Sequence, residues 1–330
     1  MAFSGDVLIH TSLWEQARET AGGDGYDFSP MFAETAPLVA AADLGICHLE
    51  VPIAPPGEEP STFPLYGAPR ELVAGIKSGG YNRCSTASNH TLDQGTAGID
   101  ATLVEFDAQG MGQAGMARTP EEIEPRPFEV NGVQVCHLSY TWSFNGLSLP
   151  SDEPWRSVEI DTDRIIADAT LARERGAEVV VVSMHWGAET VAAITSTQRR
   201  QAEAITASGQ VDLIVGHHTH VVQPIEQVNG VWTVFGMGNV LSNHPTREFF
   251  PPSSQDGVIV TVTVEVSAAG DVTVARPVAH PTWVDRRNGY VIRDVLGQLA
   301  RPDLAAGMRA VYVESLERTR RMVGEFFPAR

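Results

Sequence analysis

The sequence has few basic residues, and Lys77 is its single lysine. Lysine and arginine together number 23 against 41 aspartates and glutamates, so the 330-residue chain has a formal net charge of −18. Non-specific binding to nucleic acid or to anionic lipid requires a basic surface. This balance therefore excludes nucleic acid as a general partner.

Long apolar runs are also absent. No stretch reaches the roughly 18 apolar residues that a membrane helix requires. Met1 leads directly into a predicted strand rather than into a basic and apolar signal segment. Such a beginning fits a cytoplasmic protein and equally a mature domain whose leader has been removed. The chain is nevertheless 43% hydrophobic, which is enough for a sizeable core in one large or two ordinary domains.

Cysteine is scarce as well. Cys47, Cys84 and Cys136 are too few for a disulfide framework, and no two of them have Cys-x-x-Cys spacing. Each lies in or beside an apolar run. We therefore predict buried structural cysteines, and we expect any metal site to use other ligands.

Strand-like apolar runs alternate with helix-like stretches through most of the chain. Strands are predicted at 2–9, 44–49, 82–87, 133–140, 178–184, 213–216 and 231–235, and helices at 12–21, 31–42, 70–77, 95–109, 162–175 and 197–208. After these come a predicted hairpin, formed by 257–266 and 271–278, and a mostly helical tail at 290–327. This order predicts an α/β core with a largely parallel sheet, an added antiparallel part and a C-terminal helical layer.

Histidines follow two of the buried strands at their carboxyl ends, where open α/β sheets bind ligands. The run from Leu213 to His220 ends in Gly-His-His-Thr-His, and His218 and His220 are two residues apart. Residues at this spacing in extended backbone project to the same side, so both imidazoles can reach one metal ion. His185 follows the run of valines at 179–182 in the same way. A polar loop with incidental histidines is the alternative, but three of ten histidines within four positions disfavour it.

A third motif, Asn89-His90 with Asp93 beyond it, has two interpretations. The amide oxygen of Asn89 is a neutral metal ligand, His90 is able to donate a proton, and Asp93 is placed to orient that imidazole. Equally, these residues could simply begin a helix with Asp93 in its first turn.

Asp6 and Glu50 are single carboxylates at predicted strand ends, and they complete a nitrogen and oxygen ligand set. Two divalent ions need roughly seven to ten protein donors, with one carboxylate bridging them. A ligand set of His, Asp, Glu and Asn suits Zn, Mn or Fe and disfavours a structural cysteine–zinc site.

Six motifs occur in an order that resembles the CapA family of poly-γ-glutamate capsule synthesis proteins, within the calcineurin-like metallophosphoesterase superfamily. They are Gly5-Asp6, His48-Leu49-Glu50-Val51-Pro52, 88–95, His185-Trp186-Gly187-Ala188-Glu189, Gly216-His217-His218-Thr219-His220 and Gly236-Met237-Gly238-Asn239. The resemblance covers roughly residues 3 to 245. It implies an α/β (α+β layered) fold of the metallophosphoesterase type, a βα sandwich with helices flanking two packed sheets. We expect this domain to span 1–285, with a helical extension at 286–330 packed on it.

The resemblance also implies a role for each matching residue and two divalent metal ions, Mn, Zn or Fe. The first metal takes Asp6 and His220, the second takes Asn89, His185 and His218, Glu50 bridges the two, and His90, steadied by Asp93, is the general acid. Candidates for substrate contact or for support of the ligands are His10, His217, Glu189, Asn239 and His244.

This sequence departs from the superfamily pattern at two positions. The superfamily usually has Asp-x-His at its first motif, whereas Leu8 stands at the place of that histidine. His10 either substitutes for it or contacts substrate. Glu50 stands where the superfamily usually has aspartate, and its longer side chain changes the reach of the bridging carboxylate.

The implied activity is hydrolysis by metal-activated water, with His90 protonating the leaving group. The substrate is either a γ-glutamyl amide bond of a polyglutamate-like polymer or a phosphoester of another small anionic molecule, because fold analogy does not choose between them. A non-catalytic component of a membrane-associated polymer synthesis and export assembly is the alternative from another class, and a metal-stabilised binding protein is a third. The family resemblance favours an extracytoplasmic location, with a cytoplasmic one as the alternative.

Overall fold

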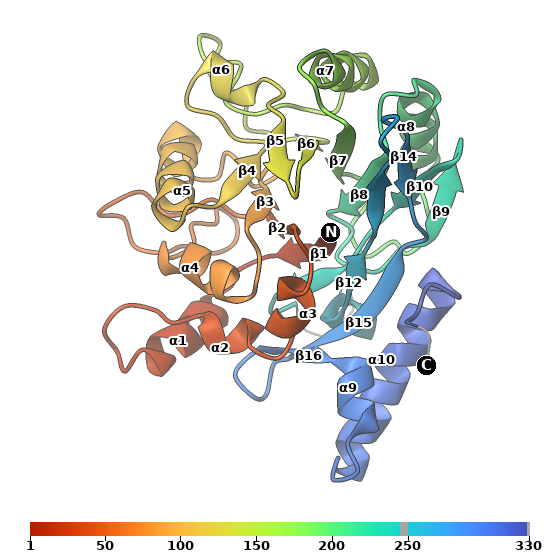
Figure 1. Cartoon of the computed structure of the whole chain (residues 1–330). Coiled ribbons are helices and arrows are strands. Elements are labelled where there is room, and N and C mark those ends of the chain that lie inside the picture. Colours follow the sequence, from red (N-terminus) through yellow and green to blue (C-terminus); the bar gives the residue numbers. More distant parts are fainter. Residues whose placement is uncertain (245–249, 329–330) are drawn as a thin grey trace.

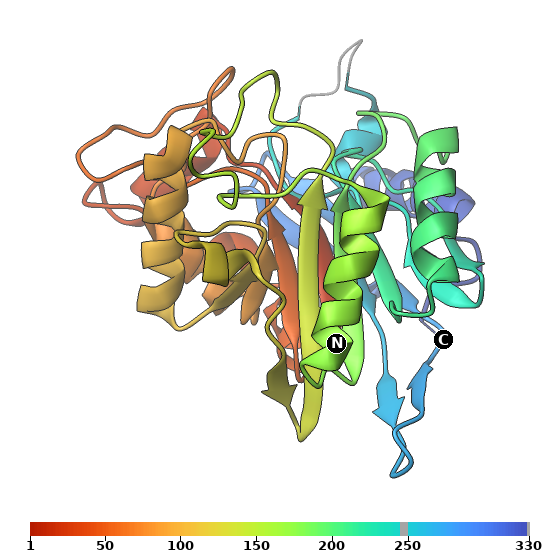
Figure 2. The same cartoon turned by 90° about the horizontal axis from the view of Figure 1, so that it is seen from above.

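The computed structural model describes residues 1–244 and 250–328. Two β-sheets lie face to face in the middle of the molecule, and helices cover their outer faces (Figure 1; Figure 2). This arrangement confirms the predicted α/β sandwich with helices flanking two packed sheets.

The first sheet has the strand order β16-β15-β12-β1-β2-β3-β4, and β11 also pairs with β1. Its strands are β1 (Ala2–Val7), β2 (Gly45–Leu49), β3 (Arg83–Ser85), β4 (Gly112–Ala114), β11 (Asn239–Leu241), β12 (Asp256–Thr261), β15 (Val278–Asp285) and β16 (Val291–Asp294). Pairing is parallel from β1 to β4 and between β1 and β11. It is antiparallel where β12, β15 and β16 extend the sheet. The expected mixture of a parallel centre and an antiparallel addition is therefore present within one sheet.

The second sheet has the order β5-β6-β7-β8-β10-β9. Its strands are β5 (Phe128–Val130), β6 (Val133–Thr141), β7 (Val179–His185), β8 (Leu213–His217), β9 (Ile225–Val228) and β10 (Val231–Val234). The four strands β6, β7, β8 and β10 run parallel, and β5 and β9 are antiparallel edges.

Helices pack on the outer face of each sheet. The first sheet is covered by helices of the N-terminal third, namely α1 (Thr11–Thr20), α2 (Ser29–Phe32), α3 (Ala36–Ala40), α4 (Glu71–Ser78) and α5 (Gly95–Gln109). The second sheet is covered by α7 (Thr162–Glu174) and α8 (Ser196–Ala207), and the short α6 (Pro120–Ile123) precedes β5. Thr195 and Gln198 form a reciprocal capping box at the start of α8, in which the side chain of each accepts a hydrogen bond from the backbone N–H of the other.

The valine run of β7 shows how one sequence serves two cores. Val179 and Val181 pack between the two sheets with Phe3 of β1, whereas Val180 and Val182 pack beneath the helices of the second sheet. Side chains alternate between faces along a strand. The prediction that this run is a strand buried on both faces is confirmed.

The C-terminal part adds strands as well as helices. The predicted hairpin is present as β13 (Val264–Val266) and β14 (Val272–Val274), but the expected strand 257–266 is divided, because its first half, β12, belongs to the first sheet. After residue 285 the chain forms β16 at the sheet edge and then α9 (Val295–Ala300) and α10 (Ala306–Val323). Within the described residues, none of the helices has the length and apolar character needed to cross a membrane.

All three cysteines are buried, as predicted, but the pairing of two of them was not anticipated. Cys47 of β2 and Cys84 of β3 form a disulfide, and Cys136 is buried with a free thiol. The two strands are parallel neighbours in which these residues are register partners, so their Cα atoms lie 4.4 Å apart. The sequence separation of 37 residues gives no local sign of this pairing.

Candidate metal centre

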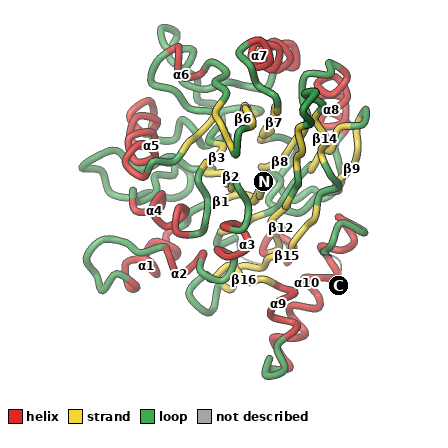
Figure 3. The backbone as a smooth tube through the Cα atoms, in the orientation of Figure 1, coloured by secondary structure: helices red, strands yellow, loops and turns green. Residues whose placement is uncertain are grey.

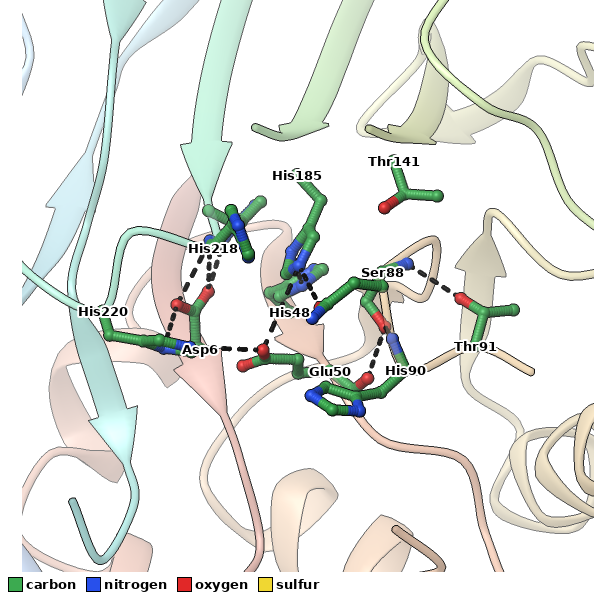
Figure 4. Close-up of polar contacts among 12 residues, drawn as sticks. Asp6, His48, Glu50, Ser88, His90, Thr91, Thr141, His185, His218 and His220 are labelled. Atoms are coloured by element: carbon green, nitrogen blue, oxygen red, sulfur yellow. Dashed lines mark hydrogen bonds and ion pairs between the residues drawn. The ribbon is translucent and has the colours of Figure 1, made fainter. Parts of the chain in front are cut away.

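A dense cluster of histidines and carboxylates lies at the carboxyl ends of β1, β2, β7 and β8 (Figure 4). Parallel pairing brings these ends together: Asp6 is the register partner of His48, and His185 is the register partner of His217. Glycine is needed at Gly216, because an added Cβ there would lie 1.9 Å from the carbonyl oxygen of Phe235. The strand ends therefore approach more closely than larger residues would permit.

Glu50 is the central carboxylate of this cluster. It is fully buried, and among residues 1–244 and 250–328 neither of its side-chain oxygens has a hydrogen-bond partner. Its Oε1 lies 3.5 Å from Nε2 of His220 and 4.0 Å from Nε2 of His185. Burial raises the pKa of Glu50 well above its usual range, and the charges of Asp6 and Glu189 add to this while His220 opposes it. A buried carboxylate with unpaired oxygens is costly unless a cation compensates it.

Asp6 contacts the ring nitrogen of His220 that does not face Glu50. Its Oδ2 lies 3.1 Å from Nδ1 of His220, and the same nitrogen lies 2.9 Å from Oδ1 of Asn239. Burial opposes ionisation of Asp6, but the neighbouring imidazoles of His217 and His220 outweigh it and hold the pKa well below its usual range. Burial likewise opposes the charged form of His220, yet Glu50 and Asp6 raise the pKa of His220 to about 10.

The potential ligand atoms form overlapping groups. Asp6, Glu50 and His220 make one group and Glu50, His185 and His218 make a second, with the ligand atoms of each group within 4.8 Å of one another. The two groups share Glu50, and the buried Nδ1 atom of His218 has no hydrogen-bond partner among the residues that the structure describes. The residues present therefore fit divalent metal ions, which would satisfy these unpaired atoms.

The structure also gathers the residues of the third motif beside the second group. Oδ1 of Asn89 lies 2.7 Å from Nε2 of His185. Nδ1 of His90 lies 2.7 Å from Oδ2 of Asp93, and the backbone N–H of Tyr66 donates to the same oxygen at 2.8 Å. Because α5 begins at Gly95, this motif lies in the turn before the helix, and His90 and Asp93 are not its first turn.

The five candidates for substrate contact or support lie around the cluster at different depths. Asn239 contacts His220 directly, as described above, and Glu189 is exposed and forms a group with His218 and His220. His217 is buried, its Nδ1 lies 3.6 Å from Oδ1 of Asp6, and it groups with Asp6 and His48.

His10 and His244 form a further pair at the margin. Their ring centroids are 5.2 Å apart, and His244 also packs 4.6 Å from His220. The nitrogen Nε2 of His10 lies 3.4 Å from the hydroxyl of Tyr66, and burial with neighbouring positive charge lowers the pKa of His10 to about 4. Within residues 1–244 and 250–328, the close ligand groups do not include His10. His10 therefore lies at the margin of the cluster, and both of its suggested roles stay predictions.

Sequence reasoning missed His48 as a residue of the site. His48 is fully buried, with Nε2 2.9 Å from Nδ1 of His185, Nδ1 2.8 Å from the hydroxyl of Ser85, and its ring stacked 4.0 Å from that of His217. A usable signal was present, because His48 precedes Glu50 by two residues on one strand and such residues share a face.

Two residues from long connections were missed as well. Tyr66 packs edge-on against His90 with ring centroids 4.7 Å apart, and Trp142 lies 5.4 Å from the ring of His218. Neither residue has a local pattern that points to a site, because the loops alone bring them there.

The fold defines a class of protein first. The calcineurin-like phosphoesterase YfkN of Bacillus subtilis matches with a TM-score of 0.50 and 14% identity over 97% of this chain and 98% of that one. The NAD nucleotidase of Haemophilus influenzae matches with a TM-score of 0.52 and 13% identity over 100% of this chain and 64% of that one. At such identities the likeness shows a shared fold alone, the calcineurin-like phosphoesterase fold.

The sequence then defines the family. The model of the bacterial capsule synthesis protein family PGA_cap matches residues 1–244, so the chain belongs to that family and the resemblance found in the sequence is confirmed. The PGA biosynthesis protein CapA of Bacillus subtilis is 28% identical over 243 residues, 72% of this chain and 62% of that protein. A probable polyglutamine synthesis accessory protein of Mycobacterium tuberculosis is 26% identical over 220 residues, 62% of this chain and 57% of that protein. The chain thus spans less than two thirds of the length of these relatives.

Proposed function

We propose that the protein is a metal-dependent hydrolase that cleaves γ-glutamyl amide bonds of a polyglutamate-like polymer during its synthesis, release or degradation. The observation that carries the hydrolase part is Glu50, a buried carboxylate that belongs to two groups of potential ligands and whose oxygens have no hydrogen-bond partner in the described part of the chain. The polymer part rests on the relatives, whose names refer to PGA, capsule and polyglutamine synthesis.

Six residues would hold two divalent ions. The first ion would take Asp6 and His220, the second would take Asn89, His185 and His218, and Glu50 would bridge them. When bound, such a pair of ions supplies Lewis-acid polarisation of the scissile group and a water nucleophile at neutral pH. The donors are nitrogen and oxygen atoms, which suits Mn, Zn or Fe.

The chain itself would orient the proton donor. Asp93 accepts a hydrogen bond from Nδ1–H of His90, which fixes the ring and directs Nε2 away from the carboxylate. Oδ2 of Asp93 accepts from both His90 and the backbone N–H of Tyr66, whereas Oδ1 has no hydrogen-bond partner within the described ranges. His90 is thereby positioned to protonate a leaving amine, with Tyr66 packed against its ring.

The same groups would serve phosphoester hydrolysis. Because the protein shares its fold with calcineurin-like phosphoesterases, phosphoesters are the second candidate class of substrate. In both cases negative charge develops beside the metals and a leaving group needs a proton. The substrate test below separates the two candidates.

One assay series tests the proposal. Bound metal is measured by elemental analysis, and the protein is then assayed on γ-glutamyl oligomers and on p-nitrophenyl phosphodiesters. His90→Ala is expected to lower kcat on the true substrate by about 10²- to 10⁴-fold while the bound metal stays the same. His280→Ala is the matched control, because His280 is a half-buried histidine of β15 whose side chain bonds the hydroxyl of Thr261, away from the candidate metal centre.

The results decide between the alternatives. Cleavage of the oligomers supports the proposal, and cleavage of the phosphodiesters alone replaces it with a phosphoesterase. A protein with about two bound metals and no hydrolysis of either would be the non-catalytic component of a polymer assembly. A protein that purifies without metal and does not respond to added Mn²⁺ or Zn²⁺ would contradict the metal centre itself.

We further propose that this chemistry takes place outside the cytoplasm, next to a membrane-associated synthesis complex. The Cys47–Cys84 disulfide supports an oxidising compartment, because cytosolic proteins seldom keep structural disulfides. Fractionation of cells that express the native gene tests this. Recovery in the cytosol with both thiols reduced would favour the cytoplasmic alternative.

A further inference from the structure

Four buried side chains form a continuous chain of contacts from β3 to the candidate metal centre. The hydroxyl of Ser85 lies 2.8 Å from Nδ1 of His48, and Nε2 of His48 lies 2.9 Å from Nδ1 of His185. Nε2 of His185 lies 2.7 Å from Oδ1 of Asn89. All four residues are at most 2% exposed, so their hydrogen bonds are made within the protein.

Hydrogen bonds can run along this chain in two directions. In the first, Ser85 donates to His48, His48 donates to His185, and His185 donates from Nε2 to Asn89. In the second, His185 donates from Nδ1 to Nε2 of His48, and His48 donates from Nδ1 to the hydroxyl of Ser85. The Ser85 hydroxyl then donates to the carbonyl of Cys47, 3.3 Å away. Each imidazole carries one proton in both directions, so the change alters no charge.

Only the second direction leaves Nε2 of His185 free of its proton. Nε2 is the nitrogen that faces Glu50, and metal coordination requires an unprotonated imidazole nitrogen. In the first direction Nε2 of His185 is protonated and donates to Asn89. Both nitrogens of His48 and of His185 then have a hydrogen-bond partner when no metal is present.

We propose that His48 is a positioning residue that presents Nε2 of His185 to the metal by switching the direction of the Ser85–His48–His185 chain. The inference rests on the metal-binding part of the proposed function. His48 suits this task because its ring is stacked on the ring of His217, with centroids 4.0 Å apart. This stacking fixes the plane of the His48 ring while its two nitrogens contact Ser85 and His185. Supporting hydrogen bonds of this kind select the tautomer of a ligating histidine.

The first test is nuclear magnetic resonance of protein labelled with ¹⁵N-histidine, in which two-bond couplings identify the protonated nitrogen of each ring. In metal-free protein His48 and His185 are expected to carry their protons on Nε2. With Zn²⁺ added, both are expected to carry them on Nδ1. If the proton of His48 stays on the same nitrogen in both states, or if His185 retains its Nε2 proton with Zn²⁺ bound, the inference is wrong.

The second test compares variants by chelator competition for Zn²⁺. His48→Leu removes the acceptor for His185 and is expected to weaken binding about 10- to 100-fold. His48→Gln places an amide oxygen where Nε2 was and is expected to restore most of the affinity, which a merely structural role would not predict. Equal affinity for the wild type and His48→Leu, or equal loss for the Leu and Gln variants, would overturn the inference.

A pair of serine variants gives the matched control. Ser85→Ala removes the far end of the chain and is expected to weaken Zn²⁺ binding and to mix the tautomers of His48. Ser183→Ala removes an equally buried hydroxyl that bonds His137 at 2.8 Å, outside the chain, and is expected to change neither. Wild-type protein that binds no Zn²⁺ would refute the metal centre together with this inference. Normal binding with unaffected His48 variants would refute the inference alone.

Discussion

Individual histidines of the site have very different proton affinities because their neighbours differ. His218 and His220 are two residues apart in one turn, both with positive φ. Burial and the positive charge of His220 lower the pKa of His218 to about 3, whereas the carboxylates around His220 raise its pKa to about 10 despite its burial. Neutral His218 is ready to act as a ligand, and His220 in the metal-free protein is a counter-ion for Asp6 and Glu50.

His10 gives a pH-dependence prediction at this scale. Burial lowers its pKa to about 4, so the folded protein binds a proton at His10 less readily than the unfolded chain does. Its contribution to stability is therefore present above the unfolded value near 6.5 and is lost as the pH falls towards about 4. We expect His10→Gln to reduce the slope of unfolding free energy against pH in that window by up to about 1.4 kcal/mol per pH unit. Urea unfolding of chelator-treated protein between these pH values measures this, and parallel slopes for both proteins would contradict it.

The sequence was informative for ligands at strand ends and uninformative for their supports. Asp6 and His185 lie at the ends of the apolar strands β1 and β7, and Glu50 and His218 directly follow β2 and β8. Their convergence could therefore be predicted, and the structure brings them together. The disulfide could not be predicted in this way, because it depends on the register of β2 against β3. His48 was overlooked because a single histidine within an apolar strand is ordinarily a core residue.

At the scale of elements, the approach of strands to one another depends on glycine. Gly216 of β8 lies under the carbonyl of Phe235, which also accepts a hydrogen bond from Nε1–H of Trp186. This close contact keeps the end of β8, and hence the Gly-His-His-Thr-His turn, against the segment that follows β10.

Gly216→Ala is expected to destabilise the protein by more than about 3 kcal/mol, because the new methyl group would lie 1.9 Å from a backbone oxygen that cannot move freely. Gly307→Ala is the control. Gly307 lies in α10 with open space around its Cα, so the same change is expected to stabilise by about 0.4 to 1 kcal/mol. Chemical unfolding measures both, and a near-neutral Gly216→Ala would show that the strands separate easily.

A buried carboxylate contributes to the attachment of α10 to the sandwich, in addition to the hydrophobic packing of Tyr312 and Val323. Asp256 of β12 is 1% exposed and accepts hydrogen bonds from Ser315 at 2.7 Å and from Nε of Arg318 at 2.6 Å. Both partners belong to α10, so this carboxylate joins the C-terminal helix to the first sheet.

Asp256→Ala would leave the Arg318 guanidinium and the Ser315 hydroxyl without their acceptor, and we expect a loss of about 3 kcal/mol in the free energy of unfolding. The exposed pair of Arg301 and Asp303, 2.8 Å apart, supplies the comparison. Asp303→Ala is expected to cost much less than Asp256→Ala, because water solvates both charges of this pair. Similar losses for the two variants would mean that the contact of Asp256 does not hold α10 in place.

There is also a physical reason why some strands and helices could be predicted from the sequence and others could not. The long buried strand β7 has a strong apolar pattern, and the structure contains it and the long helices α5 and α7 near the expected positions. The three-residue strands β4 and β11 have no pattern of their own and exist because a neighbouring strand offers them backbone partners. The strand β15 was also missed, because its alternation is weak and Pro281 interrupts it.

At the scale of the whole molecule, the excess of acidic residues conflicts with a polyanionic substrate. A net charge of −18 repels a polyglutamate chain over most of the surface, and attraction would be confined to the metal ions. Salt screens the long-range repulsion more than it screens contacts within the buried centre.

Rising salt is therefore expected to increase kcat/KM for long γ-glutamyl polymers between about 50 and 300 mM NaCl, where the Debye length shortens. A γ-glutamyl substrate of the same bond type with its free carboxylates esterified is the control and is expected to respond little. Initial rates over this range check the expectation. A steep fall in the rate for the polymer would show that basic side chains guide it to the centre.

The candidate ligands and the walls around them come from different parts of the architecture. The ligands leave from strand ends or from the tight turns that follow them, whereas Tyr66 belongs to the connection between β2 and α4 and Trp142 to the connection between β6 and α7. Figure 3 shows both connections as long stretches of loop, and Figure 2 shows them at the same end of the molecule. Insertions or exchanges in these two connections can therefore accumulate during divergence, or be introduced by loop grafting, while the strands that carry the ligands keep their register. Under this division, homologues that retain every ligand are free to acquire different substrates, and substrate assays of loop chimaeras would trace specificity to the connection that supplies it.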